Sequence, residues 1–139
     1  MRLVHRRASV VTALLAGLAF VASMVGATPA AAATWTLSDH VQRICVDSEY
    51  GANNIYVLAS VTGHTDGIIH TGVRNLPPNS VNHGGTIYPD ELNTHGNHNG
   101  FVFISVAPNP VGLYTAEIWA NDGYEEQTAP LEINIAEDC

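Results

Sequence analysis

Two histidines in the second half of the chain have the spacing of a metal-binding pair. His95 and His98 are three positions apart in the segment ELNTHGNHNG, which is rich in Gly and Asn. Imidazole is a common ligand of Zn²⁺ and Cu²⁺, and a flexible loop lets two rings reach one ion. A third ligand could come from His83, Asp90 or Glu91. One hypothesis is therefore an extracellular Zn²⁺ or Cu²⁺ site; the alternative is an ordinary solvated loop and a chain without a cofactor.

Aromatic residues at alternating positions form a second candidate site. Tyr56, Phe101, Phe103 and Trp119 lie in segments that alternate like β-strands, on the side that faces away from the expected core. Exposed apolar clusters of this kind bind sugars or partner proteins, or form the seam of a homodimer. The alternative is that the N-terminal segment around Trp35 covers them.

The sequence lacks the motifs of common enzymes. It contains no Gly-x-Ser-x-Gly elbow, no His-Glu-x-x-His pair and no phosphate-binding glycine loop. Carboxylates are plentiful, but the sequence alone places no pair of them across a cleft. We therefore expect a non-catalytic binding or interaction module rather than an enzyme. A further alternative is an inhibitor of an extracellular hydrolase that presents a rigid loop such as 89–100.

The first 33 residues have the organisation of a secretory signal peptide. Three arginines within the first seven residues are followed by an apolar run at 8–25 and by three alanines at 31–33. A basic start, an apolar centre and small residues before a cleavage site are the three parts of such a signal. A membrane anchor is less favoured, because the run is short and has no basic flank after it. We expect residues 1–33 to be removed and 34–139 to form one secreted domain.

The predicted domain is strongly acidic. All 13 acidic residues follow residue 33, whereas only two of the five arginines do, Arg43 and Arg74, and there is no lysine. The formal charge of 34–139 is therefore −11 with His neutral. Nucleic acids and anionic membranes bind to basic surfaces, so neither is an expected partner. The unknown partner is instead expected to be an extracellular protein or a glycan.

The two cysteines predict one disulfide bond. Cys45 and Cys139 are 94 positions apart, and an exported domain with two cysteines usually pairs them. Closing a loop of that length contributes about 4–5 kcal/mol in the chain-entropy model. The alternation of the last strand continues to the C-terminus and predicts that Cys139 faces inward.

The organising stretch of the fold is PNPVGLYTAEIWANDG at 108–123. A Gly-x-Tyr at the start of a β-run predicts a tyrosine corner, in which the hydroxyl of Tyr114 bonds back to the preceding backbone. Other short runs alternate with Gly, Pro and Asn turns, while 80–100 looks irregular apart from 86–88. The fold class is therefore all-β: a single immunoglobulin-like antiparallel β-sandwich of seven to eight strands. Its expected strands are 41–46, 55–62, 68–76, 86–88, 101–106, 113–120 and 131–136.

Three segments also carry a resemblance to a known group of proteins. The sequences TGVRNLPPNS and PNPVGLYTAEIWANDG are similar to the middle and later strands of bacterial Ig-like and fibronectin-III-like modules. With the start TWTLSDHVQRICVD and the terminal Cys139, residues 34–139 resemble an uncharacterised family of small secreted bacterial proteins. The resemblance implies a β-sandwich and export, and it carries over no catalytic residue.

Overall fold

The computed structural model describes residues 34–94 and 96–139, and the predicted signal peptide lies outside them. This part of the chain contains eight strands and one short helix. No helix in it is long and apolar enough to span a membrane. The elements in chain order are β1 (Trp35–Leu37), β2 (Gln42–Asp47), β3 (Ala52–Gly63), β4 (Ile69–Arg74), β5 (Val81–Ile87), α1 (Pro89–Asn93), β6 (Asn97–Val106), β7 (Gly112–Asn121) and β8 (Glu126–Ala136).

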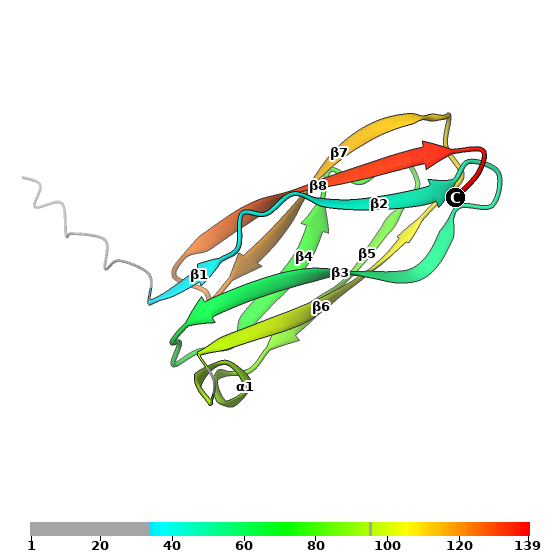
Figure 1. The fold of residues 1–139 in the computed structure, drawn as a ribbon. Coiled ribbons are helices and arrows are strands. Elements are labelled where there is room, and N and C mark those ends of the chain that lie inside the picture. The colour runs from blue at the N-terminus through cyan, green and yellow to red at the C-terminus, as the bar shows by residue number, and fades with distance from the viewer. Residues whose placement is uncertain (1–33, 95) are drawn as a thin grey trace, which may run out of the picture. The chain divides into compact units, whose positions relative to one another are not determined.

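The strands form one continuous sheet that curls into two facing halves (Figure 1). The order is β1-β3-β6-β5-β4-β7-β8-β2, and β5 joins the two halves by pairing with both β6 and β4. The prediction of an all-β, immunoglobulin-like sandwich with up to eight strands is confirmed. One strand pair departs from the antiparallel arrangement, because β2 runs parallel to β8.

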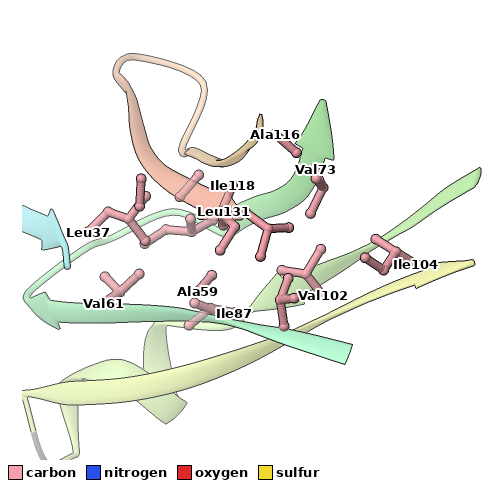
Figure 2. Close-up of a cluster of buried hydrophobic side chains, with 14 of the residues drawn as sticks. Leu37, Ala59, Val61, Val73, Ile87, Val102, Ile104, Ala116, Ile118 and Leu131 are labelled. Atoms are coloured by element: carbon pink, nitrogen blue, oxygen red, sulfur yellow. The ribbon is translucent and has the colours of Figure 1, made fainter. Parts of the chain in front are cut away.

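Alternating side chains fill the space between the two halves. In Figure 2, Ala59 and Val61 of β3 point towards Ile118 and Leu131 of the opposite half. Each of these four residues is at most 1% exposed, as the period-two pattern predicts. Burial of such apolar side chains is the main force that holds the halves together.

The first two strands, β1 and β2, lie on different halves of the sheet. β1 pairs with β3, with Leu37 opposite Val61, and β2 continues along β8. This register turns Trp35 and Leu37 into the core, where they are 1% and 5% exposed. The idea that this segment covers outward aromatics is therefore wrong, since a residue opposite the inward Val61 must also face inward.

The turn between β7 and β8 is tied to this N-terminal strand through Asp122. Its Oδ2 accepts a hydrogen bond from Nε1 of Trp35 at 2.7 Å, and its Oδ1 accepts from the N–H groups of Tyr124 and Glu125. Partial burial raises the pKa of Asp122, but the hydrogen bonds from Glu125, Trp35 and Tyr124 lower it. The net pKa lies below its ordinary value of 3.8.

The predicted tyrosine corner and the predicted disulfide bond are both confirmed. The hydroxyl of Tyr114 donates to the carbonyl oxygen of Pro110 at 3.0 Å, which is the expected tyrosine corner. Cys45 and Cys139 form a disulfide with a Cα–Cα distance of 5.6 Å. The predicted inward orientation of Cys139 is wrong, because β8 ends at Ala136 and both cysteines are exposed.

The segment 80–100 is more regular than its sequence indicates. It contains the whole of β5, the helix α1 and the start of β6. β8 likewise begins at Glu126, before Pro130, where a polar turn was expected. Pairing with distant strands decides these assignments, so glycines and a proline that suggest loops are accommodated within strands.

Candidate ligand-binding groove

Strand β5 changes its neighbour in the middle of its length. Gly84 lies opposite Phe103 of β6, and the next residue, Gly85, lies opposite Thr71 of β4. Gly84 has a φ of 74°, a left-handed conformation that favours glycine. A Cβ at Gly85 would collide with the backbone oxygen of Phe101. The glycine pair therefore allows β5 to pass from one half of the sheet to the other.

Asn82 fills the gap that opens where β5 leaves β4. Its Oδ1 accepts hydrogen bonds from the backbone N–H groups of Val73, at 3.0 Å, and Gly84, at 3.1 Å. The side chain thus replaces a backbone partner for β4 and fixes the bend in β5. Within the described residues, nothing accepts a hydrogen bond from Nδ2 of Asn82, so this amide group is free to contact a ligand.

Trp119 lies across the neighbouring strand at Gly72. The two residues are cross-strand partners between β7 and β4. A Cβ at Gly72 would meet Cζ2 of Trp119 at 2.5 Å and Nδ2 of Asn82 at 2.8 Å. The absence of a side chain at position 72 therefore lets the indole ring lie close to the backbone, beside the amide of Asn82.

These features form an open groove on the outer surface of β4, β5 and β7. Its volume is about 490 Å³, within the roughly 300–1,000 Å³ typical of ligand sites. No carboxylate, guanidinium or ammonium group lines it. We call it the Trp119 groove; its lining residues are His70, Thr71, Asn82, His83, Gly84, Gly85, Thr86 and Trp119.

Several polar groups of the Trp119 groove have no partner within the protein. Among residues 34–94 and 96–139, none is hydrogen-bonded to Nε1 of Trp119, to the ring of His70 or to the hydroxyl of Thr86. His83 differs, since its Nε2 is hydrogen-bonded to Oγ of Ser105 at 2.9 Å. The groove therefore offers donors and acceptors that protein contacts do not already use.

A hydrogen-bonded charge cluster lies near Trp119, on β4, β7 and β8. Arg74 donates from Nε to Glu117 and from Nη1 to Glu126, each at 2.7 Å. The hydrogen bonds to Glu117 and then Glu126 raise the pKa of Arg74, and the bond from Arg74 is the main cause of the lowered pKa of Glu126. These charges largely satisfy one another, so the groove is not bordered by an unpaired cation.

The other predicted aromatics lie on a separate surface. Tyr56 of β3 is paired with Phe103 of β6, and its ring makes an edge contact with Phe101 at a centroid distance of 5.0 Å. Tyr56, Phe101 and Phe103 are 55%, 51% and 38% exposed, so they face outward as predicted. Trp119 is on the other half of the sheet, so the four residues do not form one site.

The predicted histidine ligands are not brought together by the residues that the structure describes. His98 lies on β6 opposite Val61, whose side chain is buried, whereas His83 is bonded to Ser105, seven positions further along β6. At about 3.3 Å per residue, seven positions span roughly 23 Å. His83 is therefore not a third ligand beside His98. A site that includes His95 stays a prediction, because His95 lies outside the described residues.

Most of the segment 89–100, which was expected to be a rigid loop, belongs to a helix and a strand. Pro89–Asn93 is the helix α1, and β6 begins at Asn97. Glu91, considered above as a metal ligand, instead accepts a hydrogen bond from the N–H of Tyr88 at 2.9 Å and caps that helix. Asp90 is in the first turn of the same helix. Within 34–94 and 96–139, no group of three potential metal ligands is close enough to share an ion.

Sequence reasoning found Trp119 but missed the residues around it. His70, Asn82 and Thr86 have ordinary local surroundings, and only the pairing of β4 with both β5 and β7 brings them together. The available signal was a set of glycines inside strands, at Gly72 and at the pair in β5, because interior strand glycines often mark close approach.

Comparisons with known proteins give one family match and several distant structural likenesses. Residues 36–137 match the model of a family described as "Family of unknown function (DUF5980)". No curated protein matches the chain. The solved structures that resemble it include WR4, an MSP family member of C. elegans, at 12% identity and a TM-score of 0.39, covering 74% of this chain and 98% of that one.

Two other solved structures are similarly distant. A PapD-like domain of human CEP192 has 10% identity and a TM-score of 0.38, and the match covers 76% of this chain and 87% of that one. The VesB protease of Vibrio cholerae has 14% identity and a TM-score of 0.36, and the match covers 70% of this chain but only 31% of the protease chain. These likenesses are too weak to indicate a function.

Proposed function

Because the chain belongs to a family of unknown function (DUF5980), its function has to be inferred from its own surface, and we propose a non-catalytic module that binds a neutral saccharide. The observation that carries this proposal is the indole of Trp119, which lies over Gly72 in an open groove that lacks carboxylate, guanidinium and ammonium groups but is rich in unused hydrogen-bonding groups.

The composition of the groove matches the surface of a sugar. A pyranose ring has an apolar C–H face, which packs on an aromatic ring, and a rim of hydroxyls, which need donors and acceptors. Trp119 supplies the aromatic surface, while the free groups of His70, Asn82 and Thr86 lie around it. A cationic ligand would find no carboxylate in the groove, and an anionic ligand would find no guanidinium or ammonium group there.

Export is part of the proposal and is supported by two features. The disulfide between Cys45 and Cys139 is typical of proteins in oxidising compartments. Residues 1–33 have the order of basic, apolar and small residues that characterises a secretory signal. Glycans of the cell surface or of extracellular polymers are therefore the expected ligands.

A binding experiment with named polysaccharides tests the proposal. The purified, oxidised protein is incubated with insoluble cellulose, chitin, xylan and starch, and the unbound fraction is measured after sedimentation. Depletion by at least one polymer is expected, without release of reducing ends. Trp119→Ala should weaken the interaction about 30-fold, since a central aromatic anchor contributes about 2 kcal/mol.

Matched variants make the result specific to the groove. Tyr124→Ala removes an aromatic side chain that is 99% exposed at the β7–β8 turn, and binding should not change. The proposal is wrong if the native protein binds none of the four polymers, or if Trp119→Ala binds as tightly as the native protein. Release of reducing ends would contradict the non-catalytic part.

A further inference from the structure

The outer face of β3 and β6 carries an aromatic cluster that the Trp119 groove does not use. Tyr56 and Phe103 are directly opposite each other, as are Leu58 and Phe101. The ring of Tyr56 contacts Phe101 at 5.0 Å and Phe103 at 6.5 Å, both edge to face. We call these four side chains the aromatic face. All four are partly exposed to solvent.

The aromatic face is free of charge in a chain that is otherwise highly acidic. The outward residues along both strands are apolar or neutral, although 13 acidic residues are distributed over the rest of the domain. The outer face of the opposite half, in contrast, carries the charged residues Arg43, Arg74, Glu117, Glu126 and Glu132. The outward neutral residues are Tyr56, Leu58, Ser60 and Thr62 on β3 and Asn97, Asn99, Phe101, Phe103 and Ser105 on β6.

The distribution of charge identifies the occupant, and we propose that the aromatic face binds a second copy of this chain. A basic partner would be attracted to the acidic surfaces, which lie elsewhere. Two copies of an acidic chain repel each other over most of their surface, so they can approach closely only through a neutral face. The aromatic face is such a surface, and its apolar centre supplies the attraction.

The geometry suits a two-fold interface. In a symmetric pair the same patch lies on both copies, so Phe101 of each copy can pack between Tyr56 and Phe103 of the other. β6 is hydrogen-bonded on both sides, to β3 and β5, so its backbone needs no ordering on association. Polar neighbours at the rim are already satisfied, as Ser60 donates to Asn99 at 2.7 Å.

The size of the aromatic face sets the expected affinity. At 55%, 51% and 38% exposure, the three rings offer roughly 220–360 Å² in total, given about 150–250 Å² for a complete aromatic side chain. A standard interface buries about 800 Å² on each partner. Even with the polar rim, the interface is therefore small, and the expected dissociation constant is micromolar rather than nanomolar.

Sedimentation velocity over about 1–500 µM tests the proposal directly. The oxidised protein should shift from monomer to dimer across this range. Because the association is apolar and the two bodies carry like charge, 0.5 M NaCl should tighten it, whereas an ionic interface would weaken. A protein that remains monomeric throughout at both salt concentrations, or a dimer that salt dissociates, would overturn the proposal.

Variants locate the interface. Phe101→Ser/Phe103→Ser should abolish the dimer without a core cavity, since both rings face outward. Tyr124→Ser, at the β7–β8 turn outside the aromatic face, should leave the dimer intact. If the double variant fails to fold, Tyr56→Glu is used, which places a carboxylate on each copy. Concentration-dependent amide shifts of the native protein must also map to β3 and β6; shifts confined to other strands would refute the assignment.

Discussion

Replacement of Gly72 by alanine is the sharpest test of how the Trp119 groove is built. The new methyl group would lie 2.5 Å from Cζ2 of Trp119 and 2.8 Å from Nδ2 of Asn82. Carbon atoms pack at about 3.5–4.0 Å, so the indole must move by about 1 Å. Overpacking of this kind costs roughly 1–3 kcal/mol. The lower entropy of the unfolded alanine chain offsets about 0.4–1 kcal/mol of that.

Gly72→Ala is therefore expected to lower the free energy of unfolding by about 1–2 kcal/mol and to weaken saccharide binding about tenfold. Urea denaturation measures the first effect, and depletion by the polysaccharide that binds best measures the second. Acrylamide quenching should report a more accessible Trp119, because the other tryptophan, Trp35, is only 1% exposed.

The matched control is the same substitution in a Trp119→Ala background. With the indole removed there is no clash, so Gly72→Ala should no longer destabilise the protein and should slightly stabilise it. The coupling energy between the two positions is expected to be about 1–3 kcal/mol. An equal loss of unfolding free energy on Gly72→Ala in both backgrounds would refute the view that Gly72 is needed for the position of the Trp119 indole.

Three further predictions concern the scaffold. Gln42→Ala should lower the free energy of unfolding, measured in urea, by about 1–2 kcal/mol, because the Gln42 side chain donates to the carbonyl oxygen of Leu58 on β3 and accepts from its N–H. An unchanged urea midpoint would contradict this. Because folding lowers the pKa of Asp122, this carboxylate contributes fully to the free energy of unfolding above pH 3.8, its ordinary pKa, and the contribution is lost as the pH falls below that value. Acid titration of stability should therefore be flatter for Asp122→Asn, and identical curves would be the contrary result. Cys45→Ser/Cys139→Ser should lose about 4 kcal/mol, as closure of a 94-residue separation implies; calorimetry showing a loss below 1 kcal/mol would argue against an entropic role.

The parts of the fold that depend on local pattern could be predicted from the sequence. Alternation in the runs around Val57, Ile69 and Leu131 correctly identified the buried face of three strands. The Gly-x-Tyr pattern at Tyr114 correctly predicted that its hydroxyl would donate a hydrogen bond to the preceding backbone, here the carbonyl oxygen of Pro110. These features involve one strand at a time, so side-chain period and turn chemistry are sufficient to identify them.

The groove could not be predicted, because it depends on which strands are neighbours. β5 bends at Gly84 to join both halves, and a glycine pair in a polar segment has the local appearance of a loop. The inward position of Trp35 could not be predicted for a similar reason, since it follows from the register of β1 against β3. Trp119 was identified as outward, but its relation to His70 needed the β4–β7 register.

The disulfide also determines how the protein would respond to mechanical force. It joins Cys45 on β2 to Cys139, so tension applied at residues 34 and 139 passes through the bond and does not act on the residues between the two cysteines. Only residues 34–45 can be drawn out, which is roughly 40 Å at about 3.5 Å per residue. Without the bond, the same pull could extend residues 34–139 to roughly 370 Å. Force applied at these two residues would therefore extend only β1 and most of β2. Strands β3 to β8 would stay folded, and so would the Trp119 groove and the aromatic face.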